Sequence, residues 1–83
     1  MNFQLTRHAA EAMERRGIKA EWVEQALVVP TQVEPDKRDA NLLHHLKPIE
    51  AFGGRVLRVI FDPSDSPVRV VTLYFDRTAK DLL

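Results

Sequence analysis

The sequence predicts an α+β fold in which a helical hairpin packs on a curved antiparallel sheet of three to five strands. The prediction rests on a change of periodicity. Apolar residues recur at helical spacing up to Val28 and alternate with polar residues from Thr31 onward. The 83 residues leave room for one hydrophobic core, so we expect a single domain over residues 1–83.

The first expected elements are a short edge strand at residues 3–5 and a helix that follows it. Thr6 can accept hydrogen bonds from the first free N–H groups of this helix. Gly17 stands where a left-handed residue commonly ends a helix. Arg15 and Arg16 occupy the last turn, where exposed carbonyl groups favour positive charge. The stretch between Thr6 and Gly17 therefore predicts a complete helix with both of its ends defined.

A second helix is predicted from Ala20 to Val28. The residue before a proline is forced out of helical geometry, so this helix ends before Pro30. Its apolar residues form one stripe, which we expect to pack on the sheet. The stripe consists of Trp22, Val23, Ala26 and Leu27.

Turn-forming sequences separate the remaining strands, which we expect at residues 31–34, 41–46, 55–62 and 68–76. The strand at 41–46 is expected to stop at Lys47 and Pro48. The last two strands are the strongest, because both are rich in β-branched and aromatic residues and the proline-flanked segment 63–67 joins them as a hairpin. The tail at 77–83 is expected to add a helical turn or to fray.

Strand parity divides the last two strands into two faces. The face expected to meet the helices is apolar and consists of Leu57, Val59, Phe61, Val71, Leu73 and Phe75. The opposite face mixes apolar with polar side chains and consists of Val56, Arg58, Ile60, Val68, Val70, Thr72 and Tyr74. A face turned only to solvent does not need so many apolar residues. We therefore expect this mixed face to be a binding groove or an interface.

The composition indicates a globular chain of balanced charge. Twelve basic residues balance twelve acidic ones, and cysteine is absent. The lack of cysteine excludes disulfides and thiolate chemistry. Neither a secretion signal nor an apolar run of roughly 20 residues is present, so we expect a cytoplasmic protein without membrane contact. Nucleic-acid binders are usually basic, so any RNA contact must come from a local arginine cluster.

The sequence does not predict a metal site. Adjacent His44 and His45 point to opposite faces of a strand, so they cannot easily chelate one ion together. No carboxylate–histidine spacing indicates zinc with His8. Gly53 and Gly54 indicate a turn or bulge. We expect one of the two adjacent histidines to face inward and the other outward.

The segment from His8 to Ile18 resembles the motif H-A-x-E-R-M-x-x-R-G-I, with which a small bacterial family of unknown function opens. Its matching polar and turn residues are His8, Glu11, Arg16 and Gly17. Ala12 differs, since the family usually has arginine there. The resemblance continues through a second helix before a proline and through the last two strands. That family is similar to the RelE/ParE and BrnT toxins, small domains of β-α-α-β-β-β order, many of which cleave mRNA.

The resemblance implies the toxin of a type II toxin–antitoxin pair, a metal-independent mRNA endoribonuclease or translation inhibitor without a cofactor. Its partners would be a cognate antitoxin and mRNA or the ribosome. Such cleavage requires a base for the 2′-hydroxyl, a cation for the phosphorane and an acid for the leaving oxygen. The residues expected to supply catalysis are His8, Arg16, Arg58 and Tyr74. The residues expected to bind RNA are Arg15, Arg55 and Arg77.

A non-catalytic interaction module with the same fold is the alternative hypothesis. Its homodimer or partner interface would use the branched residues of the mixed face, which are Val56, Ile60, Val68 and Val70. The two hypotheses differ in geometry. The enzyme requires His8 and the arginines at one accessible concave site, whereas a buried His8 or arginines on separate faces favour the module.

Overall fold

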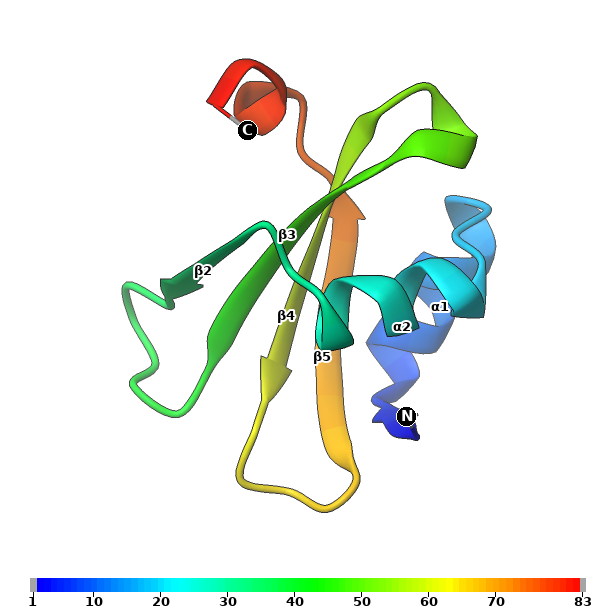
Figure 1. The fold of residues 1–83 in the computed structure, drawn as a ribbon. Coiled ribbons are helices and arrows are strands. Elements are labelled where there is room, and N and C mark those ends of the chain that lie inside the picture. The colour runs from blue at the N-terminus through cyan, green and yellow to red at the C-terminus, as the bar shows by residue number, and fades with distance from the viewer. Residues whose placement is uncertain (1, 83) are drawn as a thin grey trace.

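The computed structural model describes the backbone of residues 2–82 and the side chains of residues 2–79. Two α-helices cover one side of a five-stranded sheet (Figure 1). The helices are α1 (Arg7–Arg15) and α2 (Ala20–Val28), and the strands are β1 (Phe3–Leu5), β2 (Gln32–Pro35), β3 (Leu43–Ile49), β4 (Arg55–Asp62) and β5 (Val68–Phe75). Two 3-10 helices, η1 (Glu50–Phe52) and η2 (Arg77–Leu82), follow β3 and β5. The predicted α+β fold is confirmed.

The sheet has the strand order β1-β5-β4-β3-β2. Its strands pair antiparallel except at one edge, where β1 runs parallel to the first half of β5. Beyond the end of β1, α1 lies against β5, while α2 lies over β3 and β4 (Figure 1). The helices thus cover one face of the sheet, and we call the opposite face the open face.

Thr6 begins α1 and ties the helix to the sheet. Its Oγ1 accepts a hydrogen bond from the Ala9 N–H at 3.1 Å and donates one to the Val71 carbonyl oxygen at 3.1 Å. The predicted helix cap is confirmed, and the same hydroxyl also bonds to β5. The start of α1 is therefore held by one hydrogen bond within the helix and by another to the sheet.

Gly17 ends α1 in the left-handed conformation, with φ of 63°. The Ile18 N–H donates to the Met13 carbonyl at 2.9 Å, and the Gly17 N–H donates to the Glu14 carbonyl at 3.2 Å. This pair of bonds is the Schellman arrangement, which satisfies carbonyl groups left free at a helix end. The predicted helix stop is confirmed.

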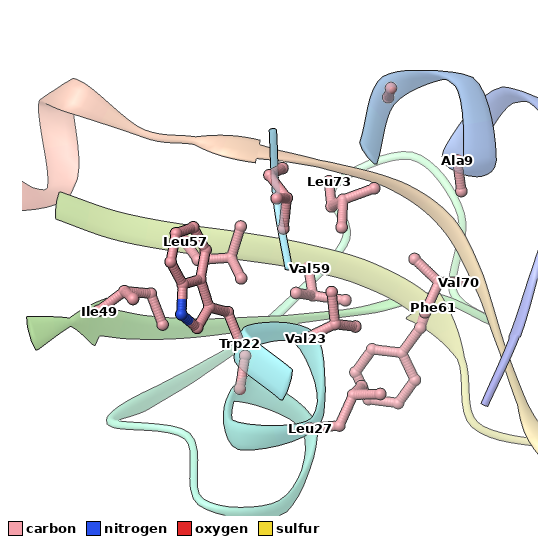
Figure 2. Packing of buried hydrophobic residues seen from close by; sticks show 13 residues of the cluster. Ala9, Trp22, Val23, Leu27, Ile49, Leu57, Val59, Phe61, Val70 and Leu73 are labelled. Carbon is pink, nitrogen blue, oxygen red and sulfur yellow. The ribbon is translucent and has the colours of Figure 1, made fainter. Parts of the chain in front are cut away.

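The core lies between the helices and the sheet (Figure 2). Trp22 and Val23 of α2 pack on β4, and Leu73 of β5 and Ala9 of α1 extend the same cluster. The apolar stripe predicted for α2 is buried in full. Of the residues predicted to face it, Leu57, Val59, Phe61 and Leu73 are buried core residues, and Phe75 packs against them partly buried.

A bulge changes the faces predicted for β5. Ile60 pairs with Thr72, but the next residue of β4, Phe61, pairs with Val70, so Val71 is an extra residue in the strand. Val70 is fully buried in the core, and Val68 packs against it, whereas Val71 is only partly buried. The predictions that Val71 faces the helices and that Val68 and Val70 share the mixed face are therefore wrong.

Three of the four residues predicted to form the interface of a non-catalytic module do not reach the surface. Val56, Ile60 and Val70 are buried within the chain, with 2%, 8% and 0% of their surface exposed. Val56 forms a small second cluster with Leu46 and Ala79, the latter supplied by η2. The tail thus contributes a helical turn, as predicted for the part that the structure describes, and covers one end of the open face.

The strand expected at residues 41–46 is shifted. Asn41 and Leu42 belong to a turn, because the Leu42 N–H donates to the Asp39 carbonyl at 3.1 Å. β3 instead runs on through Pro48 to Ile49. Pro48 lies beyond the last pair between β2 and β3, so β3 is an edge strand at this point. A proline without an N–H is tolerated on such an edge.

Replacing Thr6 tests whether this one hydroxyl joins α1 to the sheet. We expect Thr6→Ala to lower the free energy of unfolding by about 1 to 2 kcal/mol, because it removes the helix cap and the bond to the bulge. Urea unfolding followed by circular dichroism measures the change. Thr6→Ser keeps the hydroxyl, so its stability should stay within about 0.5 kcal/mol of the natural chain. Equal losses in both variants would contradict this role.

Candidate functional site

A concave pocket of about 310 Å³ opens on the face of the sheet that the helices do not cover. Sheet register explains which side chains reach it, because residues paired across neighbouring strands share a face. Arg58 of β4 is paired with Tyr74 of β5, and His44 of β3 is paired with Glu34 of β2. The chemistry-bearing side chains that line the pocket are Glu34, Asp36, His44, Arg58, Tyr74 and Asp76.

Arg58 lies at the centre of this pocket. Its side chain is only 13% exposed, and a buried guanidinium requires partners. Nε donates to the Asp76 carboxylate at 2.9 Å, and Nη1 donates to the Glu34 carboxylate at 3.0 Å. Nη1 also lies 2.8 Å from Nδ1 of His44. Four separate segments of the chain therefore meet at one guanidinium.

The contacts of His44 fix the tautomer of its ring. A guanidinium can only donate, so Nδ1 of His44 must accept the bond from Arg58 and carries no proton. The proton of the neutral ring is then on Nε2, which lies 2.6 Å from Oδ1 of Asp36 and donates to it. The result is a chain of hydrogen bonds from Asp36 through His44 to Arg58.

The charges of the pocket stabilise one another. The hydrogen bond from His44, with help from the backbone N–H groups of Asp39 and Arg38, lowers the pKa of Asp36 from 3.8 to about 2. The hydrogen bond from Arg58 lowers the pKa of Glu34. Burial lowers the pKa of Arg58, but its bonds to the two carboxylates outweigh burial and raise that pKa overall.

Asp76 belongs to the same network through a turn of its own. The pKa of its carboxyl is lowered, chiefly by the hydroxyl of Thr78, which donates to Oδ1 at 2.6 Å. The Thr78 N–H donates to the same oxygen at 2.9 Å, which leaves Oδ2 for Arg58. The turn after β5 therefore positions Asp76 toward the open face.

One nitrogen of Arg58 remains available. Nη2 makes no hydrogen bond to any residue that the structure describes. No buried side-chain nitrogen or oxygen in the described part of the chain lacks a partner, so Nη2 is in contact with solvent. The pocket thus presents a rigidly held cation with one free edge, beside the phenol of Tyr74.

The structure brings together only part of the predicted catalytic set. Arg58 and Tyr74 line the open-face pocket, as expected for a mixed sheet face. His8 is exposed and lies outside the lining, with Nε2 3.2 Å from Oγ1 of Thr72. Arg16 lies in a different pocket.

That second pocket has a volume of about 270 Å³ and is lined by Arg16, Arg55, Phe75 and Arg77. Arg55 and Arg77, both predicted to bind RNA, meet there with Arg16. Arg15, the third predicted RNA-binding residue, is exposed at the end of α1 and does not line this pocket. Two of the three arginines predicted to bind RNA therefore lie together with Arg16, in a pocket separate from that of Arg58.

The three histidines lie apart. His45 faces the helices, where Nδ1 lies 3.0 Å from the Ala26 carbonyl and the ring meets Phe61 edge-on. His44 lies on the open face, so the prediction of one inward and one outward histidine is confirmed. Among the described side chains, those of residues 2–79, no cluster of three or more histidine or acidic residues is arranged to hold a metal ion.

Sequence reasoning missed His44, Glu34, Asp36 and Asp76 as site residues. Their signal was weak, because three of them lie in short or turn-rich segments whose register with the strong strands is not visible in the sequence. His44 was the most predictable of the four, since strand alternation places one of the two adjacent histidines on each face.

Asp36 gives the pocket a measurable acid dependence. Its folded-state pKa lies below the ordinary value of 3.8, so its charge stabilises the fold above that pH, and this contribution is lost as the pH falls through about 2. We expect Asp36→Asn to be less stable than the natural chain at about pH 5, and the difference to shrink toward about pH 2. Urea unfolding at both pH values measures this.

Asp39→Asn is the matched control, since Asp39 lies in the same loop and its carboxylate bonds to the Asn41 N–H instead of His44. A pH-independent difference for Asp36→Asn, or the same pH profile in both variants, would contradict stabilisation of the Asp36 carboxylate by its hydrogen bond from His44.

Comparison with known proteins places the chain in a family. Residues 5–75 match the family model described as domain of unknown function (DUF4258). The match includes both α-helices, β2 to β5 and the pocket residues His44, Arg58 and Tyr74. No curated protein and no solved structure matches the chain. Among the described residues, no helix has the length and apolar character needed to cross a membrane. Since the match covers most of its length, the chain belongs to the domain-of-unknown-function family DUF4258.

Proposed function

We propose that this chain is the toxin of a toxin–antitoxin pair and that it acts on RNA at the open-face pocket. The observation that carries the proposal is the free Nη2 edge of Arg58, held beside His44 and Tyr74 in a pocket open to solvent. The resemblance of the first helix to the toxin-related motif and the order of the helices and strands support the same assignment.

Arg58 would bind the scissile phosphate. Guanidinium groups bind phosphate oxygens through paired N–H donors, and a charge-assisted bond is about twice as strong as a neutral one. Because Asp76 and Glu34 hold Nε and Nη1, the free Nη2 is presented in a fixed orientation. Only a small turn of this guanidinium, which breaks its bond to His44, is then needed for it to stabilise the charge of the phosphorane.

His44 would act as the general base. Nδ1 of its neutral ring accepts only the bond from Arg58, and Asp36 holds the proton on Nε2. When the guanidinium turns to a phosphate, Nδ1 is released and can take the proton of a ribose 2′-hydroxyl. The 2′-oxygen then forms a bond to phosphorus, the bond to the 5′-oxygen breaks, and that oxygen takes a proton from the Tyr74 hydroxyl. The products are a 2′,3′-cyclic phosphate and a 5′-hydroxyl.

The rim of the pocket supplies charge for the RNA backbone. Lys37 and Arg38 line it from the loop between β2 and β3, and both side chains are exposed. Neither forms an ion pair with a residue that the structure describes. These two cations offset the charges of Glu34 and Asp76. An RNA backbone would therefore contact positive charge at the rim of the pocket, while the carboxylates inside are paired with Arg58.

A non-catalytic interaction module is the second candidate, and the pairing of Arg58 favours it. Two carboxylates neutralise this arginine, and His44 uses both ring nitrogens, as in a network that only holds strands together. The predicted arginines also lie in two separate pockets, whereas His8 is exposed as the enzyme hypothesis requires. One experiment separates the two candidates.

Growth arrest on induced expression is the test. We expect the natural chain to arrest growth and His44→Gln and Tyr74→Phe to relieve the arrest. Purified protein should cleave RNA to 2′,3′-cyclic ends, and each substitution should slow cleavage by about a hundredfold or more, the usual effect of losing a general acid or base. Circular dichroism verifies that both variants remain folded.

His8→Ala is the comparison variant, because His8 lies outside the pocket lining. It should arrest growth as the natural chain does. Relief by His8→Ala but not by His44→Gln would place the reaction at the start of α1, outside the open-face pocket. A folded natural chain that neither arrests growth nor cleaves RNA would contradict the toxin proposal and leave the interaction module.

A further inference from the structure

The second pocket gathers three arginines from three elements. Arg16 is the C-cap residue of α1, Arg55 begins β4, and Arg77 begins η2, with Asp76 between it and β5. Figure 1 shows these ends at the same end of the sheet, and together with Phe75 they line one cavity of about 270 Å³. We call it the arginine pocket. It lies on the helix side of β4, since Arg55 pairs with Ile49, whose side chain is in the core.

Aromatic rings hold Arg55 in place. Its guanidinium carbon lies 4.8 Å from the ring centre of Phe52 and 5.0 Å from that of Phe75. These two rings are 4.9 Å apart and pack on Trp22 in the core. A cation over the face of an aromatic ring is stabilised without a carboxylate. Arg55 is thus positioned while its hydrogen-bond donors have no partner among the described residues.

No carboxylate of the described residues neutralises these arginines. Elsewhere in the chain Arg7 pairs with Glu11, Arg58 with Glu34 and Asp76, and Arg69 with Asp65. Arg16, Arg55 and Arg77 have no ion pair and no hydrogen bond from their side chains within the described part of the chain. Three positive charges that line one cavity repel each other, and a bound anion removes that repulsion.

We propose that the arginine pocket binds the terminal phosphate monoester of an oligonucleotide or nucleotide. A phosphate monoester carries up to two negative charges and has three terminal oxygens, which matches three guanidinium donors from separate directions. A phosphodiester has one charge and two such oxygens, so it matches this pocket less well. Phe75 adds an apolar wall against which the sugar or base can pack. This site is independent of the chemistry proposed for the open face.

The test compares short oligoribonucleotides that differ only in their ends. They carry 2′-O-methyl groups, so the protein cannot cleave them, and end in a 5′-phosphate, a 3′-phosphate or no phosphate. We expect one phosphorylated end to bind at least about tenfold tighter than the unphosphorylated strand, by fluorescence anisotropy. Inorganic phosphate and a nucleoside monophosphate, added as competitors, should abolish the difference and show whether a free nucleotide suffices.

Variants locate the site. Arg77→Gln should remove the preference for the phosphorylated end, as should Arg55→Gln. Arg15→Gln removes the same charge from an exposed residue next to Arg16 that does not line the pocket, so it should keep the preference. Arg77 is exposed and unpaired among the described residues, so its replacement leaves the fold intact even if Arg55→Gln disturbs the aromatic packing. Tyr74→Phe should also keep the preference, which separates this site from the open-face pocket.

Equal affinity of the protein for all three oligoribonucleotides would overturn the proposal. So would an equal loss in Arg15→Gln and Arg77→Gln, which would indicate general charge attraction. A phosphoserine peptide that binds as tightly as the phosphorylated oligonucleotide would overturn the assignment to nucleic acid. Loss of RNA cleavage in the open-face variants leaves this result unaffected, so the two proposals can fail separately.

Discussion

The burial of one positive charge, that of Arg58, determines how the open face is arranged. A guanidinium that is 13% exposed is costly unless its donors are paired, and no single neighbour can pair them all. Its partners come from β2, β3 and the turn after β5, so their carboxylates and ring are held in one geometry. Removing any of these partners would leave a poorly solvated charge. The network therefore fixes the register of three strands and, at the same time, presents Nη2 of Arg58, which has no partner in the described part of the chain.

Strand alternation explains why the chain has two polar pockets instead of one. Arg55 and Arg58 lie three residues apart on β4, so they emerge on opposite faces of the sheet. The same holds at the end of β5, where Tyr74 and Asp76 line the open-face pocket and Phe75 and Arg77 line the arginine pocket. Counting arginines in the sequence cannot separate these sites, because side chains that are close together along a strand can lie on opposite faces of the sheet.

Local signals in the sequence predicted most of the fold and little of the site. The cap at Thr6, the stop at Gly17 and the apolar stripe of α2 each depend on neighbouring residues, so they could be read directly. The extra residue at Val71 could not, since a bulge depends on the register between β4 and β5. The partners of Arg58 lie 14 to 24 residues away, in segments whose pairing is set only by folding. A polar network formed across strands thus cannot be predicted from the sequence pattern, even when every strand is predicted correctly.

The four residues from Tyr74 to Arg77 therefore contribute alternately to the open-face pocket and to the arginine pocket. Each successive side chain goes to the other pocket, and the bond of the Asp76 N–H to the Val56 carbonyl at 2.8 Å keeps this alternation in register past the end of β5. A shift by one residue would exchange all four side chains between the faces. It would place Phe75 against the Arg58 network and Asp76 among the unpaired arginines. The same hydrogen-bonded register that completes the carboxylate shell of Arg58 thus keeps carboxylates out of the arginine pocket.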